Sequence, residues 1–180
     1  MVVPALLQIE PPRKRIYPLL IACTLLLCTL NSTRLGATER TDLHALWDDR
    51  CAECHGHSAD FARRFLQITD GRLQGRHHVD NLQLFISRHY GTPAPAAAIY
   101  AMLQAQVATP PLFRQQCSRC HDSAASLVRS TAILRDGVLL SRHSDQPMQQ
   151  FLSNHRNLTA EEIDFYHRLL TRVAIETGQP

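Results

Sequence analysis

Residues 51–56 read CAECHG, and residues 117–122 read CSRCHD. Each stretch holds two cysteines three positions apart, with a histidine directly after the second cysteine. Residues three apart lie on the same face of a helical turn, so the two thiols of each stretch point the same way. The repeated spacing therefore predicts two sites that share one chemistry.

The pattern Cys-x-x-Cys-His is the attachment signature of c-type haem. The two thiols add to the two haem vinyl groups as thioethers, and the following histidine presents its imidazole to the iron. The sequence thus predicts two covalently bound c-type haems, attached at Cys51, Cys54, Cys117 and Cys120, with His55 and His121 as iron ligands.

Other uses of cysteine fit the sequence less well. Four thiols could bind zinc, but the two pairs lie 117 − 51 = 66 residues apart, and a histidine follows both. A thioredoxin-like dithiol needs a βαβ context, which the sequence does not indicate. The remaining cysteines, Cys23 and Cys28, precede the region of the motifs and leave no pair there for a structural disulfide.

The first 37 residues have the pattern of an export signal. The basic stretch RKR at 13–15 precedes fifteen uncharged residues at 16–30, and a short polar stretch ends in Ala37. We expect residues 1–37 to be a signal peptide cleaved near Ala37, or else a retained N-terminal membrane anchor. Either alternative predicts a periplasmic location for the rest of the chain.

The net charge of +3 comes entirely from this leader. Four basic residues and one acidic residue precede position 38, which leaves 15 basic and 15 acidic residues in the remainder. Because the basic excess lies outside the part expected to fold, the sequence does not indicate a nucleic-acid partner.

An internal repeat extends well beyond the two motifs. With the same offset of 66, an ungapped register runs from Leu46 to Val107, and roughly 30% of its aligned positions are identical. The repeat predicts two haem domains, residues 38–108 and 109–180. Each should contain a short helix before the motif, a loop with an Asp-Gly turn, a second short helix and a closing helix.

Each half of the repeat should contain three helices. The first helices are predicted at 41–49 and 109–116, the second at about 79–89 and 145–155, and the closing ones at about 96–107 and from Thr159 onward. The flanks of the first Asp-Gly turn, 66–69 and 72–75, could form a short hairpin. Thr159 and Glu162 have the spacing of a capping box.

The chain resembles the c-type cytochromes, specifically a dihaem member built from two class I-like domains. The two motifs carry this resemblance, and the expected helices extend it over about residues 40–175. It implies an all-α fold, a tandem pair of small class I cytochrome c-like helical domains, each wrapped around one covalently bound haem.

The sixth iron ligand should be repeated if both haems are built alike. Met102 aligns with Arg168 and Met148 with Leu82, so neither methionine is repeated. Two histidine pairs are repeated, His77 with His143 and His89 with His155. We favour His89 and His155, because they lie on the apolar stripes of their predicted helices. His77 and His143, or an open position, remain alternatives.

Other side chains have weaker assignments. The repeated Arg76 and Arg142 are candidates for pairing with haem propionates, or are solvated loop residues. The unrepeated histidines His44, His57, His78 and His167 are expected at the surface. Core or haem-packing roles are expected for Trp47, Phe113, Phe85 and Phe151.

The favoured function is an exported dihaem electron carrier with low-spin bis-histidine haems. Its partners would be redox proteins, or it would be the cytochrome subunit of a larger oxidoreductase. The alternatives are a dihaem peroxidase-like enzyme and a gas-binding haem sensor, each with one open or labile sixth position. The close symmetry of the repeat disfavours the enzyme, which needs two unlike haems.

Overall fold

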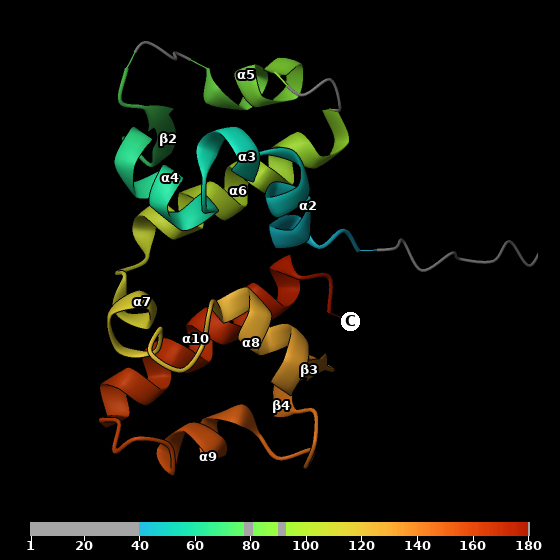
Figure 1. Cartoon of the computed structure of the whole chain (residues 1–180), viewed down its shortest axis with the longest axis vertical. Coiled ribbons are helices and arrows are strands. Elements are labelled where there is room, and N and C mark those ends of the chain that lie inside the picture. Colours follow the sequence, from blue (N-terminus) through green and yellow to red (C-terminus); the bar gives the residue numbers. More distant parts are fainter. Residues whose placement is uncertain (1–39, 78–80, 90–92, 180) are drawn as a thin grey trace, which may run out of the picture. The chain divides into compact units, whose positions relative to one another are not determined.

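The structure is a computed structural model, and it describes residues 40–77, 81–89 and 93–179 (Figure 1). Residues Glu39–Pro180 form one compact unit. The expected leader at 1–37 and His78 lie outside the described residues. Within the described ranges, no helix combines the length and apolar character needed to cross a membrane.

The two halves of the repeat contain corresponding elements, except that the helix over the first motif has only a turn as its counterpart in the second (Figure 1). The first half comprises α2 (Leu43–Arg50), α3 (Ala52–His55), α4 (Ser58–Phe65), β1 (Leu66–Thr69), β2 (Arg72–Gly75), α5 (Leu82–His89) and α6 (Pro93–Ala108). The second comprises α7 (Leu112–Gln116), α8 (Ala124–Thr131), β3 (Ala132–Arg135), β4 (Val138–Ser141), α9 (Met148–Ser153) and α10 (Ala160–Glu176).

The all-α expectation, a pair of class I cytochrome c-like helical domains, is wrong, because the fold is mixed. Strands β1 and β2 form an antiparallel hairpin, and β3 and β4 form a second one. Each Asp-Gly turn has positive φ at both residues, 50° and 73° at Asp70 and Gly71 and 50° and 79° at Asp136 and Gly137. Such turns match the twist of paired strands and so favour hairpins over open loops.

Two helices were missing from the sequence-based expectation, which had a loop directly after each motif. Helix α4 begins where His57 Nδ1 accepts a hydrogen bond from the amide of Ala59 at 3.3 Å. Helix α8 begins where Ser123 Oγ accepts one from the amide of Ser126 at 3.0 Å. A side chain that caps the first turn supplies a start signal that the apolar pattern alone does not reveal.

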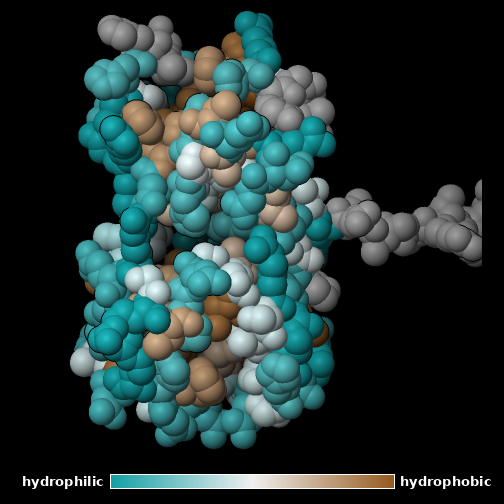
Figure 2. Space-filling model, viewed as in Figure 1, coloured by the Kyte–Doolittle hydropathy of each residue, from teal (hydrophilic) through white to brown (hydrophobic). Residues whose placement is uncertain are grey.

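Each half has its own hydrophobic core. Equivalent elements build the two cores, with Leu73 and Leu139 buried in the hairpins and Leu103 and Leu169 in the closing helices. The predicted capping box at the start of α10 is confirmed, since Thr159 and Glu162 exchange both of its hydrogen bonds. Apolar side chains also reach the surface in both halves (Figure 2).

His44, expected at the surface, is instead buried, with 9% of its area exposed. Its Nε2 lies 2.9 Å from Glu176 Oε2, near the end of α10, so the pair links the two halves of the repeat. Arg129 makes a second link by donating two hydrogen bonds to the Asp42 carboxylate, at 2.7 and 2.9 Å.

Candidate cofactor sites

The two cysteine motifs adopt the same tight turn. In the first, the amide of His55 donates to the carbonyl of Cys51 at 2.9 Å; in the second, the amide of His121 donates to that of Cys117 at 3.0 Å. The four thiols of the described residues are free, with Cys54 and Cys120 exposed and the first cysteine of each motif half-buried. Local hydrogen bonding thus presents two thiols and a histidine from a single turn.

Burial raises the pKa of the Cys51 thiol. Burial also raises the pKa of Cys117, although a hydrogen bond with Tyr166 and the charge of Arg156 oppose this effect. Nucleophilic cysteines of dithiol redox motifs have lowered pKa values. The environment of these two thiols therefore argues against the thioredoxin-like alternative.

The structure brings each motif histidine opposite a second histidine. The ring centroids of His55 and His89 lie 6.1 Å apart, and those of His121 and His155 lie 6.3 Å apart. Two imidazoles that bind one metal from opposite sides, at about 2.0–2.1 Å each, have centroids roughly 6 Å apart. The spacing of both pairs therefore fits a metal held between two rings. We call Cys51, Cys54, His55 and His89 the first site, and Cys117, Cys120, His121 and His155 the second site.

Aromatic rings hold the imidazoles of the first site. Phe61 meets His55 edge-on at 4.8 Å, and Trp47 lies 6.2 Å from the same ring. Trp47 also fixes the residue after the motif, because its Nε1 donates to the carbonyl of Gly56 at 2.8 Å. On the opposite side, Phe85 stacks on His89 at 4.9 Å with an interplanar angle of 19°.

The second site repeats this stacking, with Phe151 on His155 at 5.2 Å and 24°. Phe85 and Phe151 are 47% and 48% exposed, so neither is a core residue. Both lie beside the histidine pair of their site. Leu82 of α5 and Leu152 of α9 pack in the cores, whereas Phe85, Phe151 and the two histidines lie at the sites. The predicted helix 145–155 ends earlier, at Ser153, so His155 lies in the turn after α9.

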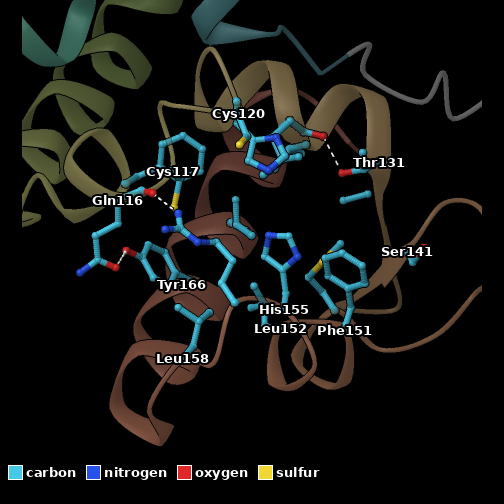
Figure 3. A pocket seen from close by; sticks show the side chains of 18 of the residues that line it. Gln116, Cys117, Cys120, Thr131, Ser141, Phe151, Leu152, His155, Leu158 and Tyr166 are labelled. Atoms are coloured by element: carbon cyan, nitrogen blue, oxygen red, sulfur yellow. Dashed lines mark hydrogen bonds between the residues drawn. The ribbon is translucent and has the colours of Figure 1, made fainter.

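A cavity of about 600 Å³ lies at the second site. Figure 3 shows Cys117 and Cys120 on one side of it and His155 and Phe151 on the other. Its lining is mostly apolar, including Met148 from α9. Cofactor pockets commonly enclose about 300–1,000 Å³ and have apolar walls with a few polar groups. Both the size and the lining fit a haem attached to these thiols.

The alternative histidines occupy different positions. Both are exposed; His77 follows β2, and His143, in the segment after β4, is among the residues that line the same cavity. Among the described residues, neither makes a ring contact with His55 or His121. The choice of His89 and His155 as sixth ligands stays a prediction that this geometry favours.

Arg76 and Arg142 brace the hairpins. Arg76 Nη2 donates to the carbonyl of Arg63 at 3.3 Å, and Arg142 Nη2 donates to that of Ala132 at 2.8 Å. Arg76 thus links the segment after β2 to the end of α4, and Arg142 links the segment after β4 to β3.

A polar cluster that the sequence pattern does not indicate lies at the second site. Tyr166 donates to Gln116 Oε1 at 2.8 Å, and Arg156 donates to the carbonyl of Gln116. Burial raises the pKa of Tyr166 far above its usual range, so the hydroxyl stays protonated. The repeat pairs this residue with Tyr100, whose hydroxyl instead accepts from the amide of Leu73 at 2.9 Å. The aligned tyrosines therefore make different contacts in the two halves.

Within the described ranges, no cluster of three or more His, Cys, Asp and Glu residues could by itself hold a metal ion. Each site instead contains a pair of histidines beside a pair of thiols. The chain matches no family model, no curated protein and no solved structure.

Proposed function

We propose that this protein is an exported dihaem c-type cytochrome that transfers electrons, with two histidines on each iron. One observation carries the proposal: two Cys-x-x-Cys-His turns, 66 residues apart, each face a second histidine ring at nearly the same distance, 6.1 and 6.3 Å. Paired thiols followed by a histidine are the arrangement that c-type attachment requires. The repeated gap between imidazoles has the size of a metal bound by both rings.

The residues of each site have separate roles. The thiols form the covalent anchor, and the histidine after them supplies one axial nitrogen. His89 and His155 supply the other nitrogen, and the stacked phenylalanines fix their orientation. A bound haem contributes a one-electron couple, and histidine in place of methionine lowers its reduction potential. With His55 and His89, or His121 and His155, holding the iron, substrates would be kept from the metal, which favours electron transfer over catalysis.

The proposed partners are redox proteins that donate and accept single electrons outside the cytoplasm. The leader at 1–37 provides the route of export, either as a cleaved signal or as an anchor. N-terminal sequencing of the mature, haem-loaded protein tests the first alternative and should find a start near Thr38. Haem-loaded protein confined to the cytoplasm would contradict export.

The count of covalent haems is the decisive test. We expect intact-protein mass spectrometry after acid denaturation to find two haems on each chain. The variant Cys117→Ala, Cys120→Ala should carry one haem. The control variant Cys23→Ala, Cys28→Ala removes two leader cysteines and should keep both. Haem that extracts freely from the parent protein would overturn the proposal.

The oxidised spectrum separates the proposed carrier from its rivals. Two low-spin haems are expected, because imidazole on both sides gives iron a strong ligand field. A parent protein with one high-spin haem that turns over hydrogen peroxide would be an enzyme instead. One that binds CO without any substitution would indicate a sensor.

A further inference from the structure

The two sites, though repeated in sequence, differ in their burial. His55 and His89 are both exposed, whereas His121 and His155 are half-buried. The second site also encloses a cavity of about 600 Å³ that the side chains of α9 and α10 help to close. A group bound there is therefore shielded from water more than one bound at the first site.

The two sites also differ in charge. Residues 47–56 contain one basic and three acidic residues, which gives 1 − 3 = −2, and residues 113–122 contain two basic and one acidic, which gives 2 − 1 = +1. The aligned positions between the two cysteines show the contrast directly, with Glu53 in the first motif and Arg119 in the second. Arg119 lines the cavity of the second site.

Ion pairing does not remove this contrast. Arg50 pairs with Asp49 at 2.6 Å, and Arg114 pairs with Asp60, so these charges are compensated nearby. Asp48 interacts with Arg129, so Glu53 is the acid that remains inside the first motif, and Arg88 precedes His89. The second site keeps Arg119 and gains Arg156, and both arginines line its cavity. The acids near it are Asp122, directly after the motif, and Glu162, which acts on Cys117.

Burial and charge act on reduction in the same direction. Adding an electron to a haem iron removes one unit of positive charge. Low dielectric disfavours the more charged, oxidised iron, and burial is one of the levers by which a protein sets a haem potential. Nearby cations stabilise the added electron, and nearby carboxylates oppose it. Both effects favour reduction of the second site over the first.

We infer that the two sites are redox-inequivalent, with the higher reduction potential at the second, so that electrons enter at the first site and leave from the second. The inference rests on the proposed function. A one-electron donor protein reduces the first site and is itself oxidised. That electron then passes to the second site, which returns the first to its oxidised state, and a one-electron acceptor protein takes it from there. No bond forms or breaks.

The test is a potentiometric titration of the holoprotein, followed by visible spectroscopy at low ionic strength, where surface charges are least screened. We expect two separate one-electron waves. Arg119→Glu should decrease the midpoint potential of the higher-potential wave and leave that of the other wave nearly unchanged. Glu53→Arg should increase the midpoint potential of the lower-potential wave and leave that of the other wave nearly unchanged.

Arg135→Glu is the matched control. Arg135 belongs to β3, pairs with Asp145 at 3.4 Å and does not line the cavity. Its reversal changes the net charge as much as Arg119→Glu does, and it should move the upper wave far less. Where a reversal impairs folding, the neutral variants Arg119→Gln and Glu53→Gln should give smaller shifts of the same sign.

Three results would overturn the inference while leaving the proposed function intact. These are superimposed waves in the parent protein, a shift of the lower wave in Arg119→Glu, and equal shifts in Arg119→Glu and Arg135→Glu. A chain without covalent haem would overturn the proposed function and this inference with it.

Discussion

The imidazoles of His89 and His155 are the residues on which the proposed coordination depends. They come from α5 and from the turn after α9, and each stacks on a phenylalanine four positions earlier. The stacked ring lies close to the motif histidine of its site. The thiols on the other side are independent of it, so ligation and attachment can be tested separately.

Replacing His89 with alanine should leave the first haem covalently bound but without its strong-field sixth ligand. We expect that haem to become high-spin and to bind CO or cyanide, while the second haem keeps its low-spin spectrum. Electron paramagnetic resonance of the oxidised protein and CO difference spectra measure both effects. His155→Ala should make the second haem high-spin and leave the first haem low-spin.

The matched control is His77→Ala, because His77 is exposed and belongs to the other repeated histidine pair. Its spectrum should equal that of the parent. If His77→Ala gives the high-spin haem and His89→Ala does not, the sixth ligands are His77 and His143.

His44 is a second residue with a specific expected effect. It pairs with Glu176, which Arg172 also contacts at 2.7 Å. His44→Ala leaves a buried carboxylate with one partner fewer, so we expect a loss of about 1–3 kcal/mol in the free energy of unfolding. Urea denaturation of the holoprotein measures it. His57→Asn, at an exposed helix start where asparagine caps well, should be close to neutral; equal losses would contradict this role for His44.

At the scale of elements, Asp42 joins a helix start to the other half of the chain. Its carboxylate accepts from the amide of Ala45, which caps α2, and from Arg129 of α8. Burial by itself raises the pKa of Asp42. The hydrogen bonds from Arg129 and Ala45 outweigh burial and hold that pKa below its ordinary value of 3.8.

A lowered pKa in the folded state means that ionised Asp42 stabilises the fold at any pH above its unfolded value of 3.8. This contribution disappears as the pH falls through the lower, folded value. Asp42→Asn keeps a good N-cap but loses the charge, so it should cost about 1 kcal/mol at neutral pH. In this variant the free energy of unfolding should fall less between about pH 5 and 2 than it does in the parent. Identical pH profiles from urea titrations would show that the Arg129 pair contributes nothing.

At the scale of the whole molecule, the separate cores predict that one half keeps its haem when the other loses it. The second core is built from elements of the second half alone. In the variant Cys51→Ala, Cys54→Ala, we therefore expect one covalent haem with an unchanged low-spin spectrum. Mass spectrometry and visible spectroscopy check this outcome. Loss of both haems would show that the halves fold only together.

Much of each site could be predicted from local sequence, because its chemistry is set by short spacings. The Cys-x-x-Cys-His turns, the Asp-Gly turns and the Thr159 capping box each depend on residues within a few positions of one another. The repeat then carried each assignment from one half to the other. It left two histidine pairs, of which the apolar pattern of the predicted helices favoured His89 and His155.

The sequence by itself determined the motifs, the repeat and the hairpin turns, because covalent spacing and backbone dihedrals are local properties. The tertiary structure alone decided the burial of His44 and the unequal exposure of the two sites. Burial depends on which surfaces meet across the chain, as with His44 and Glu176, which lie 132 positions apart. A repeat aligned position by position predicts two equal sites. The packing around them instead leaves the histidines of the second site less exposed to water than those of the first.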